Sequence, residues 1–563
     1  MPVWRARAVL LLLLLGFALL IGRAAFLQGL NDQFLQKKGE SRYSRVIDTH
    51  ASRGKIVDRH GEAVAVSAPV KSLWAIPGEV RADTKQLRAL AAAIALDPAE
   101  LKRKLATTER DFVYLKRQIS PEAADKVLRL GLPGIAAQDE YRRYYPAGEV
   151  AAHVVGFTGV DGIGQEGIEL AQESELAGTP GSRRVIKDRR GHIVEDVESV
   201  RESRPGRDLT LALDNKLQYL AYSQLKQAVL QHRAKAGGVV VLDVDSGEIL
   251  AMANMPSFNP NNRGGLTGDE LRNRAVTDTF EPGSTLKPVT VATALELGKV
   301  KATTPIQTAP GTYNIGRATI SDAHVHGILS VAQVIQKSSN VGSAKIALAL
   351  RPAEMWHSFD ALGFGFESQL GFPGEAAGKL RAHATWRPIE QATMSYGHGI
   401  SVSLLQLARA YLVFARDGDV VPLSLLKRDG LPAPTPVYSP ATARAVRAML
   451  ELAVAPGGTA PRAQIMGYRV AGKTGTAHKL GDGGYAPDRY VSSFVGFAPA
   501  SKPRFIVAVM IDEPRNGQYY GGAVAAPVFS AVVEGALRSY GIAPDAPAQL
   551  PPADDLPAVP EGV

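Results

Sequence analysis

The chain begins with an uncharged, leucine-rich run, and this run limits the possible folds more than any other feature. It covers residues 8–22 and follows Arg5 and Arg7. A helix of this length reaches about 22 Å, less than the roughly 30 Å of a bilayer's hydrocarbon core. Extended over residues 8–30, it reaches about 34 Å and spans the core. We therefore expect a cytoplasmic segment (1–7), one transmembrane helix (8–30) and an exported remainder.

A cleaved signal peptide is the alternative to a permanent anchor. The apolar run is short, and Gly22-Arg23-Ala24 places small residues at the spacing that cleavage needs. If the helix is kept, Arg23 lies in its outer half, where it can reach the interface or a polar group on a partner helix. The polar residues 31–50 are expected to continue the helix out of the membrane.

Composition excludes several classes of protein. The chain has 563 residues, 45% of them hydrophobic and 21% charged, which is typical of a globular protein with more than one domain. A net charge of +9 without a basic, aromatic-rich run argues against nucleic acid binding and fits scattered surface Lys and Arg. The absence of cysteine excludes disulfides and thiolate catalysis. No histidines have metal-ligand spacing, so we predict neither a metal nor another cofactor.

Two folded domains are expected after the apolar run. Residues 31–206 mix short strands, glycine-rich turns and helical stretches without a catalytic set, which favours a structural module. Residues 207–543 have the pattern of an α+β domain, with an antiparallel sheet covered by helices. The final residues, 544–563, hold six prolines, four acidic residues and no basic residue, so we expect a disordered tail.

Periodicity places the main elements of the second domain. Strands alternate or form short apolar runs, whereas helices show apolar residues at helical spacing. The pattern predicts a helix over 215–232, strands over 238–244 and 248–252, a hairpin over 491–511 and a closing helix over 525–537.

Ser284-Thr-Leu-Lys287 supplies a candidate nucleophile and its base. The preceding Pro282-Gly283 suits a turn into a helix, and residues three apart on a helix share a face. A serine hydroxyl is a weak nucleophile until a base takes its proton. A lysine can do so if burial lowers its pKa from about 10.4. The motif alone is weak, because the chain holds a second copy.

Two further motifs complete a candidate acyl-transfer site. Ser338-Ser-Asn340 offers a hydroxyl that can relay a proton and an amide that can hold the lysine and a substrate carbonyl. Lys473-Thr-Gly-Thr476 follows a strand-like run, and Lys473 with Thr474 can bind a carboxylate, while Gly475 lets a ligand backbone approach. The backbone N–H groups of Thr476 and Ser284 could form an oxyanion hole.

Two matches elsewhere are interpreted as coincidences. The second Ser-x-x-Lys, Ser424 to Lys427, lacks the Pro-Gly turn and follows a strand-like Val-Val-Pro-Leu. Residues 467–474 fit the P-loop expression Gly-x4-Gly-Lys-Thr, but the glycine-rich segment after them cannot form the required helix.

In this order, the three motifs resemble those of class B penicillin-binding proteins. The closest resemblance is to the septal (division-specific) peptidoglycan D,D-transpeptidases of Gram-negative bacteria, and it covers nearly the whole chain except the tail. The middle motif reads Ser-Ser-Asn rather than Ser-Asp-Asn, a change that the family tolerates. Other shared segments are Arg53-Gly54, Asp58-Arg59, Glu166-Gly167, Thr277 to Ser284, Tyr396-Gly-His-Gly399, Gly457-Gly-Thr459 and Tyr519-Tyr-Gly-Gly522.

The resemblance implies a penicillin-recognising transpeptidase fold, an elongated periplasmic pedestal and an uncleaved inner-membrane anchor. Ser284 would attack the D-Ala-D-Ala bond of a stem peptide, and a diaminopimelate-type amine would resolve the acyl-enzyme. It assigns Lys287 as base, Ser338 as shuttle and Asn340 as partner of substrate and lysine. Lys473 and Thr474 would bind the carboxylate, and β-lactams would acylate Ser284.

The resemblance also implies partners, namely a polytopic septal glycosyltransferase and small bitopic division proteins. Three alternatives remain: an elongation-type transpeptidase, a D,D-carboxypeptidase or β-lactamase-like hydrolase, and a non-catalytic scaffold. The large pedestal and the intact motifs argue against the last two.

Overall fold

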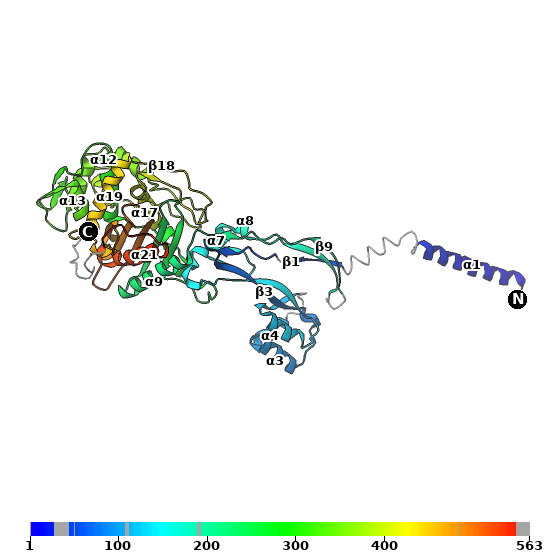
Figure 1. The fold of residues 1–563 in the computed structure, drawn as a ribbon. Coiled ribbons are helices and arrows are strands. Elements are labelled where there is room, and N and C mark those ends of the chain that lie inside the picture. The colour runs from blue at the N-terminus through cyan, green and yellow to red at the C-terminus, as the bar shows by residue number, and fades with distance from the viewer. Residues whose placement is uncertain are drawn as a thin grey trace. The chain divides into compact units, whose positions relative to one another are not determined.

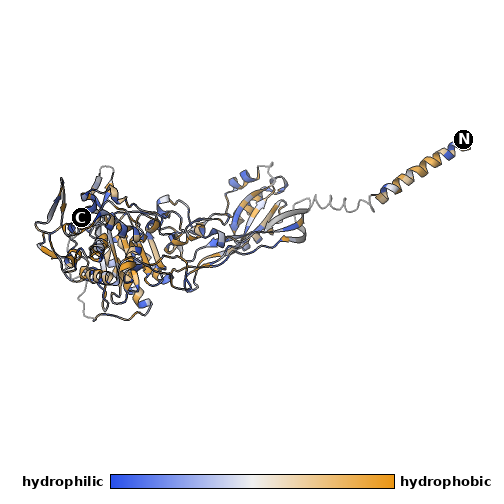
Figure 2. Ribbon diagram, turned by 90° about the horizontal axis from the view of Figure 1, so that it is seen from above, coloured by the Kyte–Doolittle hydropathy of each residue, from blue (hydrophilic) through white to orange (hydrophobic). Residues whose placement is uncertain are grey.

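The computed structural model describes residues 2–26, 44–49, 51–106, 112–187, 193–481 and 484–547. Helix α1 (Val3–Ala25) has a mean hydropathy of 2.4 over its most apolar window, and none of that window is buried. Figure 2 shows it as hydrophobic along most of its length. The prediction of one N-terminal helix able to span a membrane is confirmed, although it begins before residue 8 and residues 27–30 lie outside the described part.

The rest of the chain forms two compact units built from interleaved stretches. The first combines residues 1–54, 67–142 and 177–207, and the second combines residues 55–66, 143–176 and 208–563. The chain therefore passes back and forth between the two units along its length. No periodicity in the sequence indicates these crossings.

The first unit contains small β-sheets and short helices (Figure 1). β1 (Ser44–Thr49), β8 (Gly181–Lys187) and β9 (Ile193–Arg201) form one antiparallel sheet, in which Ile47 pairs with Arg183. The expectation that residues 31–50 continue the membrane helix is therefore wrong for 44–49, because these residues obtain their backbone hydrogen bonds from β8.

A separate apolar core holds the helices of this unit against its second sheet. Leu73, Leu90, Leu101, Leu115 and Val127 are almost completely buried there. The elements involved are η2 (Pro77–Glu79), α3 (Thr84–Ala93), α4 (Pro98–Leu105), α5 (Pro121–Leu128), β3 (Ala63–Ala75), β4 (Val113–Ile119) and β5 (Ile135–Tyr144).

The second unit is built on a five-stranded sheet in the order β12-β11-β21-β20-β19, with every neighbour antiparallel. The α+β prediction with an antiparallel sheet is confirmed. β19 forms one edge. The strands are β11 (Ala236–Asp243), β12 (Ile249–Met255), β19 (Ala471–Gly481), β20 (Gly484–Ala498) and β21 (Phe505–Asp512).

Helices bury both faces of this sheet. Val239 and Val241 of β11 belong to the core formed with α9 (Asn215–Gln231) and α21 (Ala526–Ser539), whereas Val240 and Leu242 belong to the opposite core. Alternate residues of a strand point to opposite faces, so a strand covered on both sides is apolar throughout. The helices predicted over 215–232 and 525–537 are confirmed with small changes at their ends.

The remaining elements of the second unit surround these layers. They are β2 (Ile56–Val57), η3 (Gly148–Val150), α6 (Ala152–Val155), β6 (Phe157–Thr158), β7 (Gly164–Glu166), α7 (Gly167–Ala171), α8 (Glu173–Leu176), β10 (Leu209–Thr210), α10 (Gly268–Leu271), α11 (Arg274–Thr277), η4 (Gly283–Leu286), α12 (Lys287–Glu296), β13 (Pro305–Gln307), β14 (Thr312–Ile315), β15 (Ala318–Ser321), β16 (Ile328–Ser330), α13 (Val331–Lys337), α14 (Asn340–Leu348), α15 (Pro352–Ala361), η5 (His383–Thr385), α16 (Pro388–Met394), α17 (Leu404–Ala410), α18 (Leu412–Ala415), β17 (Asp419–Val420), β18 (Thr435–Pro436), α19 (Pro440–Val454), η6 (Pro461–Ala463) and α20 (Gly521–Val524).

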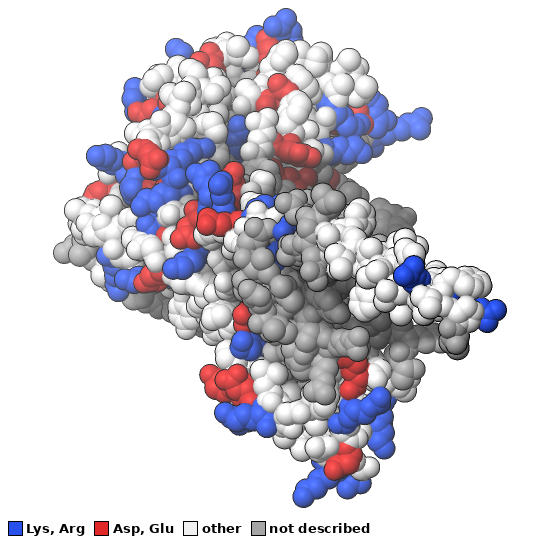
Figure 3. Space-filling model, turned by 90° about the vertical axis from the view of Figure 1, so that its right-hand side faces the viewer, with Lys and Arg blue, Asp and Glu red and all other residues white. Residues whose placement is uncertain are grey.

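The start of the proline-rich C-terminal segment is docked on the second unit. Asp545 accepts hydrogen bonds from the Arg469 backbone N–H at 2.7 Å and from the Ser501 hydroxyl. Residues 548–563, which hold most of the predicted tail, lie outside the described residues. On the face shown in Figure 3, basic and acidic residues are interspersed in small groups.

Candidate active site

Ser284 lies on a tight turn that leads directly into α12. Gly283 has φ +58°, a left-handed value that glycine adopts without strain, and η4 carries Ser284 into the helix that begins at Lys287. Gly397 packs against this turn so closely that a Cβ on it would lie 2.2 Å from the Gly283 carbonyl oxygen. Ser284 and Lys287 are both buried. The helical i,i+3 relation expected from the sequence is present.

The Lys287 ammonium group connects the first two motifs. Its Nζ lies 3.0 Å from Ser284 Oγ, 3.0 Å from Ser338 Oγ and 2.8 Å from Asn340 Oδ1. It also donates to the Ser338 carbonyl oxygen. These four partner atoms are all uncharged oxygens.

Ser338 sits in an uncommon conformation between α13 and α14. Its φ of +58° is left-handed, which costs a non-glycine residue energy and persists where the surroundings enforce it. This twist directs the hydroxyl to the two lysines, since Lys473 Nζ lies 2.9 Å from the same Ser338 Oγ that Lys287 contacts. The arrangement brings the three motifs into one connected network.

Asp322 holds the middle motif in place. The Asp322 carboxylate accepts from the Ser339 hydroxyl at 2.6 Å and from the backbone N–H groups of Asn340 and Val341. Asn340 Nδ2 in turn donates to the Ser321 carbonyl oxygen, so its Oδ1 faces Lys287. Sequence reasoning missed Asp322, because a lone aspartate after a short strand carries no recognisable signal.

The third motif lies in the middle of the edge strand β19. Lys473 and Thr474 are fully buried, and Lys473 Nζ lies 3.1 Å from Thr474 Oγ1. Thr474 Oγ1 also shares a hydrogen bond with Thr459 Oγ1 at 2.9 Å. A Cβ on Gly475 would lie 2.7 Å from the Pro282 carbonyl oxygen, so glycine is what lets β19 approach the turn before Ser284.

A cluster of side chains flanks the nucleophile turn. Glu281 accepts from the Gly399 backbone N–H at 2.7 Å and from the Tyr485 hydroxyl at 2.9 Å, and burial raises its pKa. The His398 ring lies between Tyr396 and Tyr485, at centroid distances of 5.3 and 5.6 Å. Burial, together with the Lys287 charge, lowers the pKa of His398 to about 4, so the ring is neutral near pH 7.

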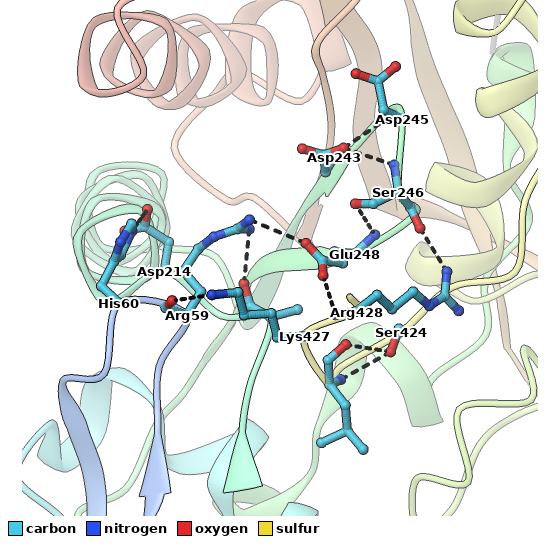
Figure 4. Close-up of polar contacts among 12 residues, drawn as sticks. Arg59, His60, Asp214, Asp243, Asp245, Ser246, Glu248, Ser424, Lys427 and Arg428 are labelled. Atoms are coloured by element: carbon cyan, nitrogen blue, oxygen red, sulfur yellow. Dashed lines mark hydrogen bonds and ion pairs between the residues drawn. The ribbon is translucent and has the colours of Figure 1, made fainter. Parts of the chain in front are cut away.

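The second Ser-x-x-Lys copy has a different geometry (Figure 4). Ser424 Oγ donates to the Leu426 carbonyl oxygen at 2.7 Å and accepts from the Leu426 N–H. Lys427 Nζ instead donates to the Arg59 carbonyl oxygen. The P-loop interpretation also fails, because Lys473 and Thr474 lie inside strand β19, which continues to Gly481 where a P-loop needs a helix.

Two family models match this chain. The penicillin binding protein transpeptidase domain matches residues 237–534, and the penicillin-binding protein dimerisation domain matches residues 48–211. The fold and the three-motif site thus define a penicillin-binding transpeptidase.

Curated relatives match over almost the full length. "Probable peptidoglycan D,D-transpeptidase PenA" of Neisseria gonorrhoeae is 44% identical over 96% of this chain and 94% of its own. "Peptidoglycan D,D-transpeptidase FtsI" of Escherichia coli K12 is 43% identical over 96% and 93%. The chain belongs to the class B penicillin-binding proteins, the family that contains these D,D-transpeptidases.

Solved structures agree. The transpeptidase domain of Burkholderia pseudomallei penicillin-binding protein 3 is 47% identical to this chain, with a TM-score of 0.56. The match covers 60% of this chain and 98% of the Burkholderia chain. Penicillin-binding protein 3 of Mycobacterium tuberculosis, complexed with aztreonam, is 28% identical with a TM-score of 0.69 over 90% of this chain and 99% of that chain.

Proposed function

We propose that this protein cross-links peptidoglycan stem peptides during septal wall synthesis through an acyl-enzyme on Ser284. The observation that carries the assignment of residues is the hydrogen-bond network in which Lys287 contacts Ser284 Oγ, Ser338 Oγ and Asn340 Oδ1 while Lys473 shares Ser338 Oγ. The family membership supports the reaction, and the match to FtsI supports the septal role over an elongation role.

In the first half-reaction, Ser284 Oγ attacks the carbonyl carbon of the penultimate D-Ala, and Lys287 takes the hydroxyl proton. The backbone N–H groups of Ser284 and Thr476 stabilise the oxyanion. Lys473 and Thr474 bind the terminal carboxylate, beside Gly475. The C–N bond breaks, Ser338 passes a proton to the leaving amine and receives in return the proton that Lys287 took from Ser284, and D-Ala departs.

In the second half-reaction, a diaminopimelate-type amine of a neighbouring stem attacks the ester carbonyl. As the new amide bond forms, the amine nitrogen gives up one proton to Lys287. The ester C–O bond breaks, and Ser284 Oγ takes that proton back from Lys287. A β-lactam follows the first half-reaction and stops there.

Helix α1 supports a proposal for the placement of the chain in the cell envelope. We propose that residues 1–7 are cytoplasmic, that residues 8–30 anchor the chain in the inner membrane, and that 31–206 and 207–543 are the periplasmic pedestal and the transpeptidase domain, followed by the tail 544–563. Arg5 and Arg7 support this orientation. A polytopic septal glycosyltransferase and bitopic division proteins are the partners expected at the helix and the pedestal.

Intact-protein mass spectrometry of the full chain in detergent, followed over time with a β-lactam, tests this function. A stable adduct of one drug molecule that maps to Ser284 is expected. An adduct that disappears within seconds as drug is hydrolysed would indicate a hydrolase, and no adduct at any drug concentration would contradict the assignment.

A further inference from the structure

The second half-reaction leaves one proton of the acceptor amine without a recipient. A primary amine with an ordinary pKa of about 10.4 arrives at pH 7 as an ammonium group, with three protons on its nitrogen. The nitrogen of the product amide keeps one of them, and Lys287 takes another and returns it to Ser284. The remaining proton must leave first, because a protonated nitrogen has no lone pair with which to attack. A base close to Ser284 would remove it where the amine is bound.

Glu281 places a carboxylate on the same turn as the nucleophile. It lies three residues before Ser284, so the two Cα atoms are no more than about 11 Å apart. Its oxygens accept from neutral donors, the Gly399 backbone N–H at 2.7 Å and the Tyr485 hydroxyl at 2.9 Å, and both hydrogen bonds are solvent-exposed. Among the described residues, Glu281 has no cationic partner. Its negative charge is therefore available to a cation that enters from solvent.

The other carboxylate beside the catalytic network already has a task. Asp322 accepts from the Ser339 hydroxyl and from the backbone N–H groups of Asn340 and Val341, and so holds the middle motif. The site also contains a charge that opposes an incoming cation, because Lys473 loses its carboxylate partner when D-Ala departs. An anion on the nucleophile turn offsets that repulsion.

Three aromatic rings connect Lys287 to Glu281. Lys287 Nζ lies 5.9 Å from the centroid of the Tyr396 ring, and the His398 ring follows at 5.3 Å from Tyr396 and 5.6 Å from Tyr485, whose hydroxyl donates to Glu281. Tyr485 is 47% exposed, and the face of a tyrosine ring attracts an ammonium group. His398 is neutral near pH 7 and adds no repulsion. An amine therefore meets only attractive or uncharged groups along this row.

Burial favours the transfer of a proton to Glu281. It raises the pKa of the Glu281 carboxyl, and it would lower the pKa of an amine bound against it, because both charged forms lose solvent. The two pKa values approach each other, and the transfer leaves two neutral groups. The titratable groups around Glu281 and the aromatic row are Tyr485 and His478 of the hairpin β19–β20, Tyr396 and His398 after α16, and Lys287 of α12.

We propose that the Glu281 carboxylate binds the ammonium group of the acceptor stem and takes one of its protons. The N–H bond breaks, Glu281 becomes the neutral acid, and the freed lone pair attacks the ester carbonyl on Ser284. Lys287 then handles the second proton. Glu281 returns its proton to solvent, and the departed D-Ala amine takes one up, so the protons balance. This inference rests on the proposed function, because it needs the acyl-enzyme on Ser284.

The test separates acylation from transfer in the full chain in detergent. An N-acyl-D-alanyl thioester acylates Ser284, and the acyl-enzyme is offered either meso-diaminopimelate, whose amines are charged at pH 7, or hydroxylamine, which is mostly uncharged. Liquid chromatography with mass spectrometry measures the ratio of aminolysis to hydrolysis products, which come from the same acyl-enzyme. In Glu281→Gln this ratio should fall at least tenfold with diaminopimelate, and should stay within about twofold with hydroxylamine.

The matched control is Glu296→Gln, the same substitution at the other end of α12, where the carboxylate contacts Ser439; it should leave both ratios unchanged. Glu281→Asp keeps a carboxylate and should retain more transfer than Glu281→Gln. An unchanged ratio with diaminopimelate in Glu281→Gln, or an equal loss with both amines, would overturn the proposal. An acyl-enzyme of the original protein that reacts with neither amine would also overturn it, whereas failure of the original protein to acylate would count against the proposed function.

Discussion

The chain presents the same four-residue pattern twice, and only one copy has the geometry of a nucleophile and its base. At Ser284 and Lys287 the pattern begins a helix, so residues three apart share a face and their side-chain atoms lie 3.0 Å apart. Ser424 and Lys427 lie in extended chain bridged to Glu248 and Thr210. In extended chain, residues three apart point to opposite sides. The chemistry of the motif therefore depends on the local backbone rather than on the letters.

Removing the serine hydroxyl from each copy in turn should give the largest difference in penicillin labelling between the two copies. Ser284→Ala removes the atom that forms the ester, so covalent labelling by a fluorescent penicillin should be undetectable. Ser424→Ala removes only the two local hydrogen bonds with Leu426 and should leave the labelling rate within about twofold. Labelling that persists in Ser284→Ala would contradict the assignment of the nucleophile.

Replacing the two lysines should give the next largest contrast. Lys287→Gln should slow acylation about 10²–10⁴-fold, the usual range for loss of a positioned base. Lys427→Gln loses one hydrogen bond to the Arg59 carbonyl oxygen and should leave the rate unchanged. Stopped-flow measurement of β-lactam acylation compares them, and similar rates in the two variants would remove Lys287 from the role of base.

Substituting a carboxylate beside each copy of the motif should separate an effect on the acylation rate from an effect on the stability of the fold. Asp322→Asn weakens the contacts that hold Ser339 and Asn340, and should slow acylation about tenfold with little change in Tm. Glu248→Gln, near Ser424, removes a largely buried ion pair with Arg59 and should destabilise the second unit by about 1–3 kcal/mol without changing the acylation rate. Thermal unfolding and acylation kinetics on both variants measure the two effects, and a reversed pattern would show that Asp322 is structural only.

Titration of His398, beside the first copy, should give the smallest effect. Its pKa is about 4 in the folded protein, against an ordinary value of 6.5, so the unfolded chain binds more protons between these values. Stability is therefore complete above about pH 6.5 and decreases as the pH falls toward 4. His398→Phe should reduce the loss between pH 7 and pH 5 by about 1–2 kcal/mol.

Thermal unfolding at pH 7 and pH 5 measures this difference. The exposed His357→Phe is the control, and it should retain the pH dependence of the original protein. Equal pH dependence in His398→Phe and the original protein would mean that another group is responsible.

Periodicity was sufficient for the layers of the catalytic unit but not for its supporting contacts. Strand β11 and helix α9 could be placed because their residues are apolar at every position or at helical spacing. Strand β1 could not, because its polar residues pair with β8, more than a hundred residues later. Parallel pairing of Leu209 with Ile56 is equally non-local.

The same limit applied within the site. The three motifs were brought together as expected from the sequence, because each is a short local pattern with its own geometry. Asp322 escaped notice because its role arises only when the hairpin of β14 and β15 brings it to the N-terminus of α14. The left-handed conformation of Ser338 could not be predicted either, because serine has no particular preference for a positive φ.

Strand β19 stands at the edge of its sheet and carries the residues that would receive the substrate. Soluble proteins usually protect such an edge with a charge, a proline or a covering loop, because open backbone groups recruit foreign strands. Here the turn before Ser284 covers part of the strand, and the remainder has to stay accessible for catalysis. The protein therefore keeps a permanent liability to aggregation at its most essential strand, and a stabilising mutation that closed this edge would be selected against.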